Sequence, residues 1–177
     1  MHRDKLLTLL AGYADRYPDE DTTRRFRTFV EGQPRCFERD CWDDGHVTSS
    51  AVVLDSAGTS MLMTHHAKLG RWLQLGGHAD GDPDTLRVAC REAMEESGLA
   101  VEPIREDILD LDIHVIPRRG DDPPHCHYDV RFLLRADRHA PLRVTGESLA
   151  LRWVLLCEME TLTTEESILR MVRKCLD

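Results

Sequence analysis

The chain has 177 residues, a length that favours one compact domain rather than two. Hydrophobic residues make up 41% and charged residues 31% of it, which excludes the disordered, collagen-like and low-complexity classes. The 23 basic and 32 acidic residues give a net charge of −9, so we expect neither a nucleic acid polymer nor a membrane surface as a partner.

The first residues, MHRDKLLTLLAGYADRY, lack the apolar core and small-residue cleavage site of a signal peptide. The chain contains no apolar run of about 18 residues that could span a membrane. Its six cysteines are scattered, and no second metal-binding pair lies close to Cys36 and Cys41. These features predict a cytoplasmic protein with reduced thiols.

Residues 1–40 contain two apolar patterns with helical spacing. The first pattern has apolar residues at positions 6, 9, 10 and 13, and the second has Phe26, Phe29 and Val30. We therefore predict an N-terminal helical extension over 1–40, followed by a main domain over 41–177. The sequence leaves open whether the extension packs on the domain, forms a homodimer surface or covers a binding site.

The main domain begins with a predicted β-hairpin, in which VTSSAVVLD (47–55) and MLMTHH (61–66) flank a short turn. Further strands are predicted at 110–116, 127–134 and 151–155. Helical segments separate some of these strands, so we predict an α/β or α+β fold.

The segment 83–97 is predicted to be a helix. Asp82 is its predicted N-cap, Pro83 its first residue and Gly98 its end. An apolar stripe at helical spacing is expected to be buried; it comprises Leu86, Ala89, Cys90 and Ala93. A last helix is predicted to begin near Thr163, which would form a capping box with Glu166.

Three glutamates of the same helix lie on another of its faces. Glu92, Glu95 and Glu96 have the spacing at which like charges repel, unless a cation lies between them. Carboxylate oxygens are suitable ligands for Mg²⁺ or Mn²⁺. Arg91 is one turn from Glu95 and is expected to hold that side chain. The alternative interpretation is an ordinary solvated acidic face.

The residues around these glutamates resemble a known motif. Gly77-x5-Pro83-x7-Arg91-Glu92-Ala93-Met94-Glu95-Glu96-Ser97-Gly98-Leu99 is similar to the Nudix box, G-x5-E-x7-R-E-U-x-E-E-x-G-U, where U is apolar. Pro83 replaces the first glutamate of that pattern. The resemblance implies a Nudix-type α/β/α sandwich with a mixed β-sheet, in addition to the N-terminal helices.

The same resemblance implies an activity, namely hydrolysis of a diphosphate bond in a nucleoside diphosphate derivative or a related small molecule. It implies Mg²⁺ or Mn²⁺ bound by Glu92, Glu95 and Glu96, with Arg91 as an orienting residue. The general base would be Glu96 or Glu147, which lies in the loop before strand 151–155. The candidate contacts with substrate are Gly77, Tyr128 and Arg131.

A second polar cluster is predicted from strand alternation, which places His127, Asp129 and Arg131 on one face of strand 127–134. Three more histidines occupy suggestive positions before strands or beside glycines. The residues of a candidate second site for Zn²⁺, Mn²⁺ or Fe²⁺ are His46, His78, His125, His127 and Asp129. For each histidine alone, a surface or hydrogen-bonded role is the alternative.

Two other functions remain open at this stage. The segments around His46 and His78 are also similar to Nudix-fold isopentenyl diphosphate isomerases, which place metal-binding histidines there. However, Gly76 occupies the position of the isomerase's catalytic cysteine, and the three intact glutamates favour hydrolysis. A nucleotide-binding sensor without turnover is the second alternative, and Pro83 is its support.

Overall fold

The computed structural model describes residues 2–176. The two predicted N-terminal helices are present as α1 (Asp4–Arg16) and α2 (Asp21–Gly32). Their apolar positions are buried as the helical periodicity predicts; these include Leu6, Leu10, Tyr13, Phe26, Phe29 and Val30. None of the helices in the described part of the chain is both long and apolar enough to cross a membrane.

All the predicted strands are present, and the structure adds three short ones. The strands are β1 (His46–Asp55), β2 (Ser60–His66), β3 (Arg71–Leu73), β4 (Leu75–His78), β5 (Val101–Pro103), β6 (Asp110–Ile116), β7 (His125–Ala136) and β8 (Ser148–Leu155). They form one sheet with a central order of β3-β2-β1-β7-β5, while β4 pairs with β1, β6 with β7 and β8 with β2. The β1–β7 pair is parallel and the other pairs are antiparallel, which makes the sheet mixed.

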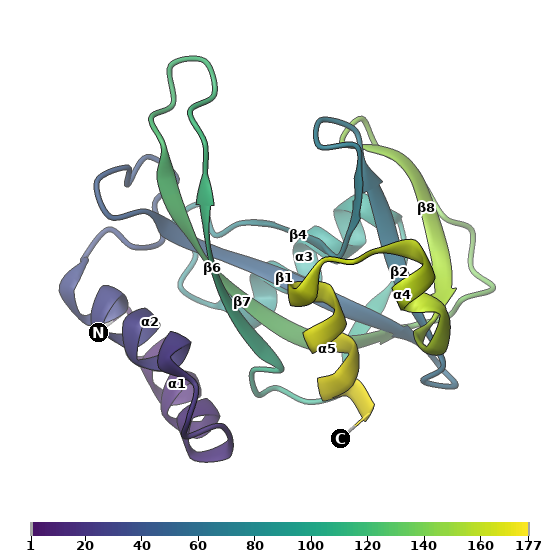
Figure 1. Ribbon diagram of the computed structural model, residues 1–177, viewed down its shortest axis with the longest axis horizontal. Helices are drawn as coiled ribbons and strands as arrows, with labels where there is room; N and C mark the ends of the chain where they lie inside the picture. The colour runs from purple at the N-terminus through teal and green to yellow at the C-terminus, as the bar shows by residue number, and fades with distance from the viewer. Residues whose placement is uncertain (1, 177) are drawn as a thin grey trace.

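Helices lie on both faces of this sheet (Figure 1). Helix α3 (Thr85–Ser97) lies behind the sheet in that view and packs on β1 and β4, whereas α5 (Glu166–Leu176) lies in front. The short helix α4 (Met159–Leu162) precedes α5. The predicted α/β/α arrangement is therefore confirmed.

The start of α3 differs from the prediction by two residues. Asp84, rather than Asp82, is the N-cap and accepts a hydrogen bond from the backbone N–H of Arg87. Asp82 instead accepts from the backbone N–H of Asp84 and pairs with the Arg87 guanidinium. Gly98 ends the helix as predicted, with a left-handed φ of 75° that suits a residue without a Cβ.

The predicted apolar stripe of α3 is correct in part. Ala89 and Ala93 are buried together with Val88, while Leu86 and Cys90 are half-buried and still pack against the core, because β1 and β4 contact the helix from that side. The capping box of α5 does not form. The Thr163 hydroxyl accepts from the backbone N–H of Glu165, and the Glu166 carboxylate pairs with Arg173.

The N-terminal helices share a core with the main domain. A continuous buried cluster joins Leu10 of α1 and Phe26 of α2 with Val47 of β1, Val88 of α3 and Phe132 of β7. A second cluster on the opposite face contains apolar residues of β2, β8 and α5. The division into an extension (1–40) and a domain (41–177) thus remains a prediction, since packing in the structure does not separate the two parts.

Candidate active site

Helix α3 directs two carboxylates toward β4. The side chains of Glu92 and Glu96 are half-buried, and a Cβ built on Gly77 would lie 2.3 Å from Oε2 of Glu92. The absence of a side chain at Gly77 therefore makes the space that the Glu92 carboxylate occupies. Glu95, by contrast, is exposed.

The electrostatic environment of these carboxylates is unfavourable for negative charge. Burial, followed by the nearby charges of Glu92 and Glu147, raises the pKa of Glu96 to about 8, although a hydrogen bond from the Gly76 backbone opposes the shift. Burial also raises the pKa of Glu92, against the opposing effect of the Arg91 guanidinium. A cation bound here would relieve this penalty.

Arg91 has a different partner from the one predicted. Its guanidinium donates to Oε1 of Glu92 at 2.7 Å and to the carbonyl oxygen of His78 at 2.9 Å, rather than holding Glu95. The burial of Glu92 beside β4 explains this choice, since the exposed Glu95 offers a weaker, hydrated partner. Arg91 thereby links α3 to β4 and fixes the Glu92 side chain.

Glu147 lies in the exposed loop before β8, close enough for its charge to affect Glu96. The backbone carbonyl of Glu147 accepts a hydrogen bond from the N–H of Ala67 at 2.8 Å, which joins this loop to the end of β2. Across residues 2–176, however, the box glutamates are not gathered as closely as ligands around a single ion. Mutual repulsion is the physical reason for that separation.

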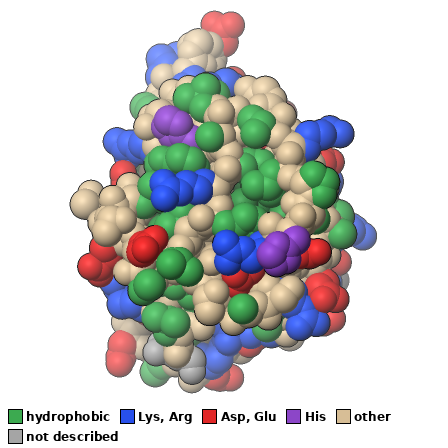
Figure 2. Space-filling view, turned by 90° about the vertical axis from the view of Figure 1, so that its right-hand side faces the viewer, with side chains coloured by type: hydrophobic (Ala, Val, Ile, Leu, Met, Phe, Trp, Pro, Cys, Tyr) green, Lys and Arg blue, Asp and Glu red, His purple; other side chains and the backbone are tan. Residues whose placement is uncertain are grey.

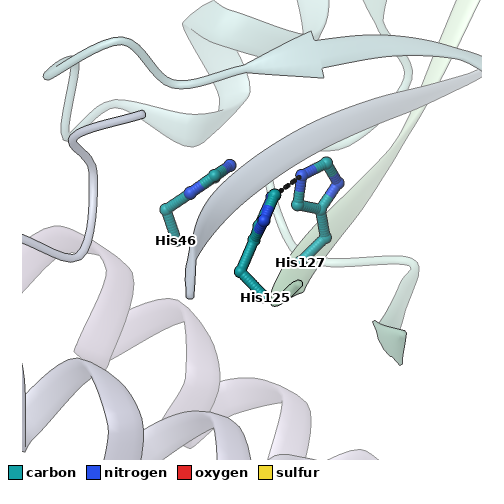
Figure 3. A group of neighbouring side chains, drawn as sticks. All are labelled: His46, His125 and His127. Carbon is teal, nitrogen blue, oxygen red and sulfur yellow. Dashed lines mark hydrogen bonds between the residues drawn. The ribbon is translucent and has the colours of Figure 1, made fainter. Parts of the chain in front are cut away.

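The histidines gather where β1 and β7 begin. His46 pairs with His127 across the parallel strands, so their side chains share a face, and His125 is two residues before His127 on that same face. The three imidazoles face one another in Figure 3. The ring of His78 lies beside them, with its centroid 5.1 Å from those of His46 and His127.

Asp129 is separate from the histidine group, contrary to the prediction for the second site. Its buried carboxylate accepts hydrogen bonds from the Thr48 and Ser50 hydroxyls and forms an ion pair with Arg131 at 2.8 Å. These neutral and cationic donors satisfy its oxygens without a metal.

Two of the predicted substrate contacts are engaged in packing and ion pairs within the fold. Arg131 is 2% exposed and is paired with Asp129, Asp110 and Asp112. The Tyr128 ring lies on the other face of β7, where it stacks on Phe29 with a centroid distance of 3.7 Å. Strand alternation predicts that these two side chains lie on opposite faces of β7. Only the packed structure shows that neighbouring elements cover both of those faces.

Sequence reasoning missed two residues that shape these sites. Arg39 donates to Nδ1 of His78 at 2.6 Å, and Asp80 acts electrostatically on both Arg91 and Glu92. Asp80 also has a positive φ of 49°, which is uncommon outside glycine. No sequence pattern pointed to Arg39, since it lies in a loop outside any segment with helical or strand periodicity. Asp80 lies two residues after the GGH segment and could have been considered.

The model of the NUDIX domain family matches residues 44–175, which is most of the chain. The chain belongs to the Nudix family. No curated protein sequence matches it significantly. Membership of this family indicates hydrolysis of a diphosphate bond, and it agrees with the box identified at residues 77–99.

Solved structures show the same Nudix fold. A NUDIX-family hydrolase from Clostridium perfringens is 24% identical, with a TM-score of 0.56 over 73% of this chain and 95% of that protein. The dihydroneopterin triphosphate pyrophosphohydrolase of E. coli is 16% identical, with a TM-score of 0.53 over 72% and 92%. The Ap4A hydrolase of C. elegans, in a binary complex, is 18% identical, with a TM-score of 0.51 over 72% and 93%.

Proposed function

We propose that this Nudix protein is a Mg²⁺- or Mn²⁺-dependent hydrolase that cleaves the diphosphate linkage of a nucleoside diphosphate derivative or a related small diphosphate. The observation that carries the proposal is the half-buried pair Glu92 and Glu96, held beside the side-chain-free Gly77. The substrates for which two similar proteins are named, Ap4A and dihydroneopterin triphosphate, belong to the same chemical class.

The donor set fits a hard divalent cation. Glu92 and Glu96 offer oxygen ligands whose raised pKa values reflect burial and nearby acidic groups, and Glu95 is available on the same helix. When bound, the metal would neutralise the diphosphate oxygens and lower the pKa of the attacking water. Pro83 replaces an outer carboxylate of the box, but Asp82 and Asp84 remain on either side of it.

The protein's own residues supply orientation and proton transfer in this proposal. Arg91 fixes Glu92 through their ion pair and fixes β4 through the His78 carbonyl. Glu96 or Glu147 would accept the proton of the attacking water as it forms its bond to phosphorus. The leaving group departs as the other phosphate-bearing product.

The substrate would approach beside Gly76 and Gly77 rather than beside the buried Arg131 or the half-buried Tyr128, whose ring stacks on Phe29. On the face seen in Figure 2, acidic and basic side chains are interspersed and neither sign forms a large patch. This face therefore lacks the broad basic patch that a long polyanion requires.

The first test is turnover of a panel that contains Ap4A, ADP-ribose, nucleotide sugars and nucleoside triphosphates, assayed with Mg²⁺ or Mn²⁺. Metal-dependent release of phosphate-bearing products is expected from the unmodified protein. In Glu96→Gln, kcat should fall by about 100-fold or more, because a metal ligand or general base is lost while the shape is kept.

Glu160→Gln, at an exposed position of α4, is the matched control and should retain full turnover. Equal activity of Glu96→Gln and the unmodified protein would contradict the assigned site. Tight nucleotide binding without turnover of any compound would instead support the sensor interpretation.

A further inference from the structure

We propose that His46, His125 and His127 form a second metal site, distinct from the carboxylates of α3, which binds a divalent transition metal ion such as Zn²⁺. The proposal is independent of the hydrolase function. It rests on the positions of the ring nitrogens, on their hydrogen bonds and on the absence of other partners for His46.

The spacing of the nitrogens fits a metal centre. One ring nitrogen from each histidine lies within 4.8 Å of the others, and the Nε2 atoms of His125 and His127 are 3.3 Å apart. Two imidazole ligands of a tetrahedral zinc ion, each bound at about 2.0–2.1 Å, have nitrogens about 3.3 Å apart. Those two histidines therefore already have the separation of metal ligands, and a small rotation would bring His46 to the same distance.

Hydrogen bonding fixes the tautomer of His125. Its Nδ1 lies 2.8 Å from the backbone carbonyl of Pro123, which can only accept, so Nδ1 carries the proton. In the neutral ring, Nε2 then presents a lone pair toward His127. A hydrogen bond from Nδ1 to a backbone carbonyl is also the usual way in which a metal-binding histidine is oriented.

His46 provides the second, independent observation. It is 1% exposed, yet neither of its ring nitrogens makes a hydrogen bond of normal geometry in the described structure. The Cys41 backbone lies near the ring but outside normal hydrogen-bond geometry. A buried polar ring without a partner carries a substantial desolvation cost, which a metal bond would offset.

The histidine group is suited to a transition metal rather than to Mg²⁺. His127 is half-buried with the rings of His46 and His125 beside it, and the neutral imidazole is the form that binds metal. The nearby carboxylate of Asp129 is already occupied by Ser50 and Arg131. The ligands are consequently all nitrogen, a set that suits Zn²⁺, Co²⁺ or Ni²⁺.

His78 borders the site but is not a ligand in this arrangement. The Arg39 guanidinium, which can only donate, lies 2.6 Å from Nδ1 of His78. The proton of the neutral ring must then be on Nε2, which leaves no lone pair for a metal. Three protein ligands would leave one coordination position open for water or another small ligand.

A metal at this position would join the beginning of β1 to the beginning of β7. His46 and His127 are paired residues of these neighbouring parallel strands, and the Trp42 ring packs against His125 with a centroid distance of 4.8 Å. The metal would therefore restrain the loops that enter both strands, and it should raise the melting temperature of the whole protein.

The test measures metal binding directly. The metal-free 177-residue chain is titrated with Zn²⁺ by calorimetry in buffer that contains excess Mg²⁺, and its melting temperature is recorded with and without Zn²⁺. We expect one equivalent of Zn²⁺ to bind and to stabilise the protein. His125→Ala and His127→Ala should each weaken binding by more than about 100-fold, because loss of an outer-shell partner alone costs about 10–100-fold.

Two controls separate this site from the carboxylates. His139→Ala, at an exposed turn, and the double variant Glu92→Gln/Glu96→Gln should both retain the Zn²⁺ equivalent and its thermal shift. Loss of Zn²⁺ binding in the glutamate variant, or unchanged binding in both histidine variants, would overturn the proposal. Failure of the hydrolase assay would leave these readouts unaffected, so the two proposals can fail separately.

Discussion

Gly77 is the residue on which the position of the Glu92 carboxylate depends. It lies on β4 directly opposite that side chain, and any Cβ there would overlap the carboxylate oxygens. The carboxylate is at the end of a flexible side chain, so the protein would accommodate a methyl group by moving Glu92 rather than by shifting backbone. The effect should therefore be on function and not on folding.

Gly77→Ala tests this expectation. We predict that kcat/KM falls by about 100-fold, because a displacement of about 1 Å in a reacting group has consequences of that size. The melting temperature should change little. Gly12→Ala in α1 is the control, since nothing lies within 4 Å of a Cβ at that position, and it should leave turnover intact. Full activity of Gly77→Ala would show that the packing of Gly77 against Glu92 is not needed.

At the scale of elements, β7 is the strand that organises both the sheet and the histidine group. It pairs with β1, β5 and β6, and one of its faces carries His127, Asp129 and Arg131 in succession. The other face contributes Phe132 and Leu134 to the apolar core. The polar face is stable only because its charges are matched by neighbouring elements.

Arg131 is at the centre of the ion pairs that balance the charges on this polar face. Its guanidinium pairs with Asp129 of its own strand and Asp110 of β6, and it also donates to the Ser167 carbonyl in α5. Asp110 in turn accepts from Arg170 and Lys174 of α5. This network attaches the C-terminal helix to the sheet, and it was not predicted from the sequence.

Arg131→Met should lower the free energy of unfolding by about 3–5 kcal/mol, because it leaves buried carboxylates without their partner. Chemical denaturation of the purified variant measures this directly. Arg135→Met is the control on the same strand. It removes an exposed pair with Glu102 and should cost no more than about 1 kcal/mol. Equal costs for the two variants would contradict the role assigned to Arg131.

At the scale of the whole molecule, both ends of the chain pack on the same sheet. Tyr13 of α1 accepts a hydrogen bond from Lys174 of α5, and Lys174 also pairs with Glu20, which lies between α1 and α2. The N-terminal helices are therefore connected to the C-terminal helix as well as to the sheet. One cooperative unfolding transition is expected.

Leu10→Ala examines that cooperativity. The leucine is 0% exposed within the shared core, so truncation should cost about 2–5 kcal/mol of global stability. Circular dichroism and tryptophan fluorescence should shift together to a lower denaturant midpoint. Thr8→Ala, on the exposed side of α1, should change stability by about 0.5 kcal/mol or less. A separate early transition confined to one probe would show instead that residues 1–40 unfold independently.

Patterns within single elements could be predicted from the sequence. The spacing of the box glutamates, the alternation of His127, Asp129 and Arg131, and the apolar faces of α1 and α2 all follow from fixed repeats of 3.6 or two residues. These repeats depend on the backbone alone. They allow most strands and the grouping of the principal carboxylates to be predicted without coordinates, while the fold family follows from the resemblance of residues 77–99 to the Nudix box.

The sequence by itself thus determined the Nudix fold and the residues with the necessary chemistry. Tertiary structure decided which of them meet: Arg91 with Glu92 instead of Glu95, His46 with His127, and Arg131 with Asp110. Such pairings join elements far apart in the chain. They depend on strand register and burial, which select a partner only once the elements are packed and water is excluded.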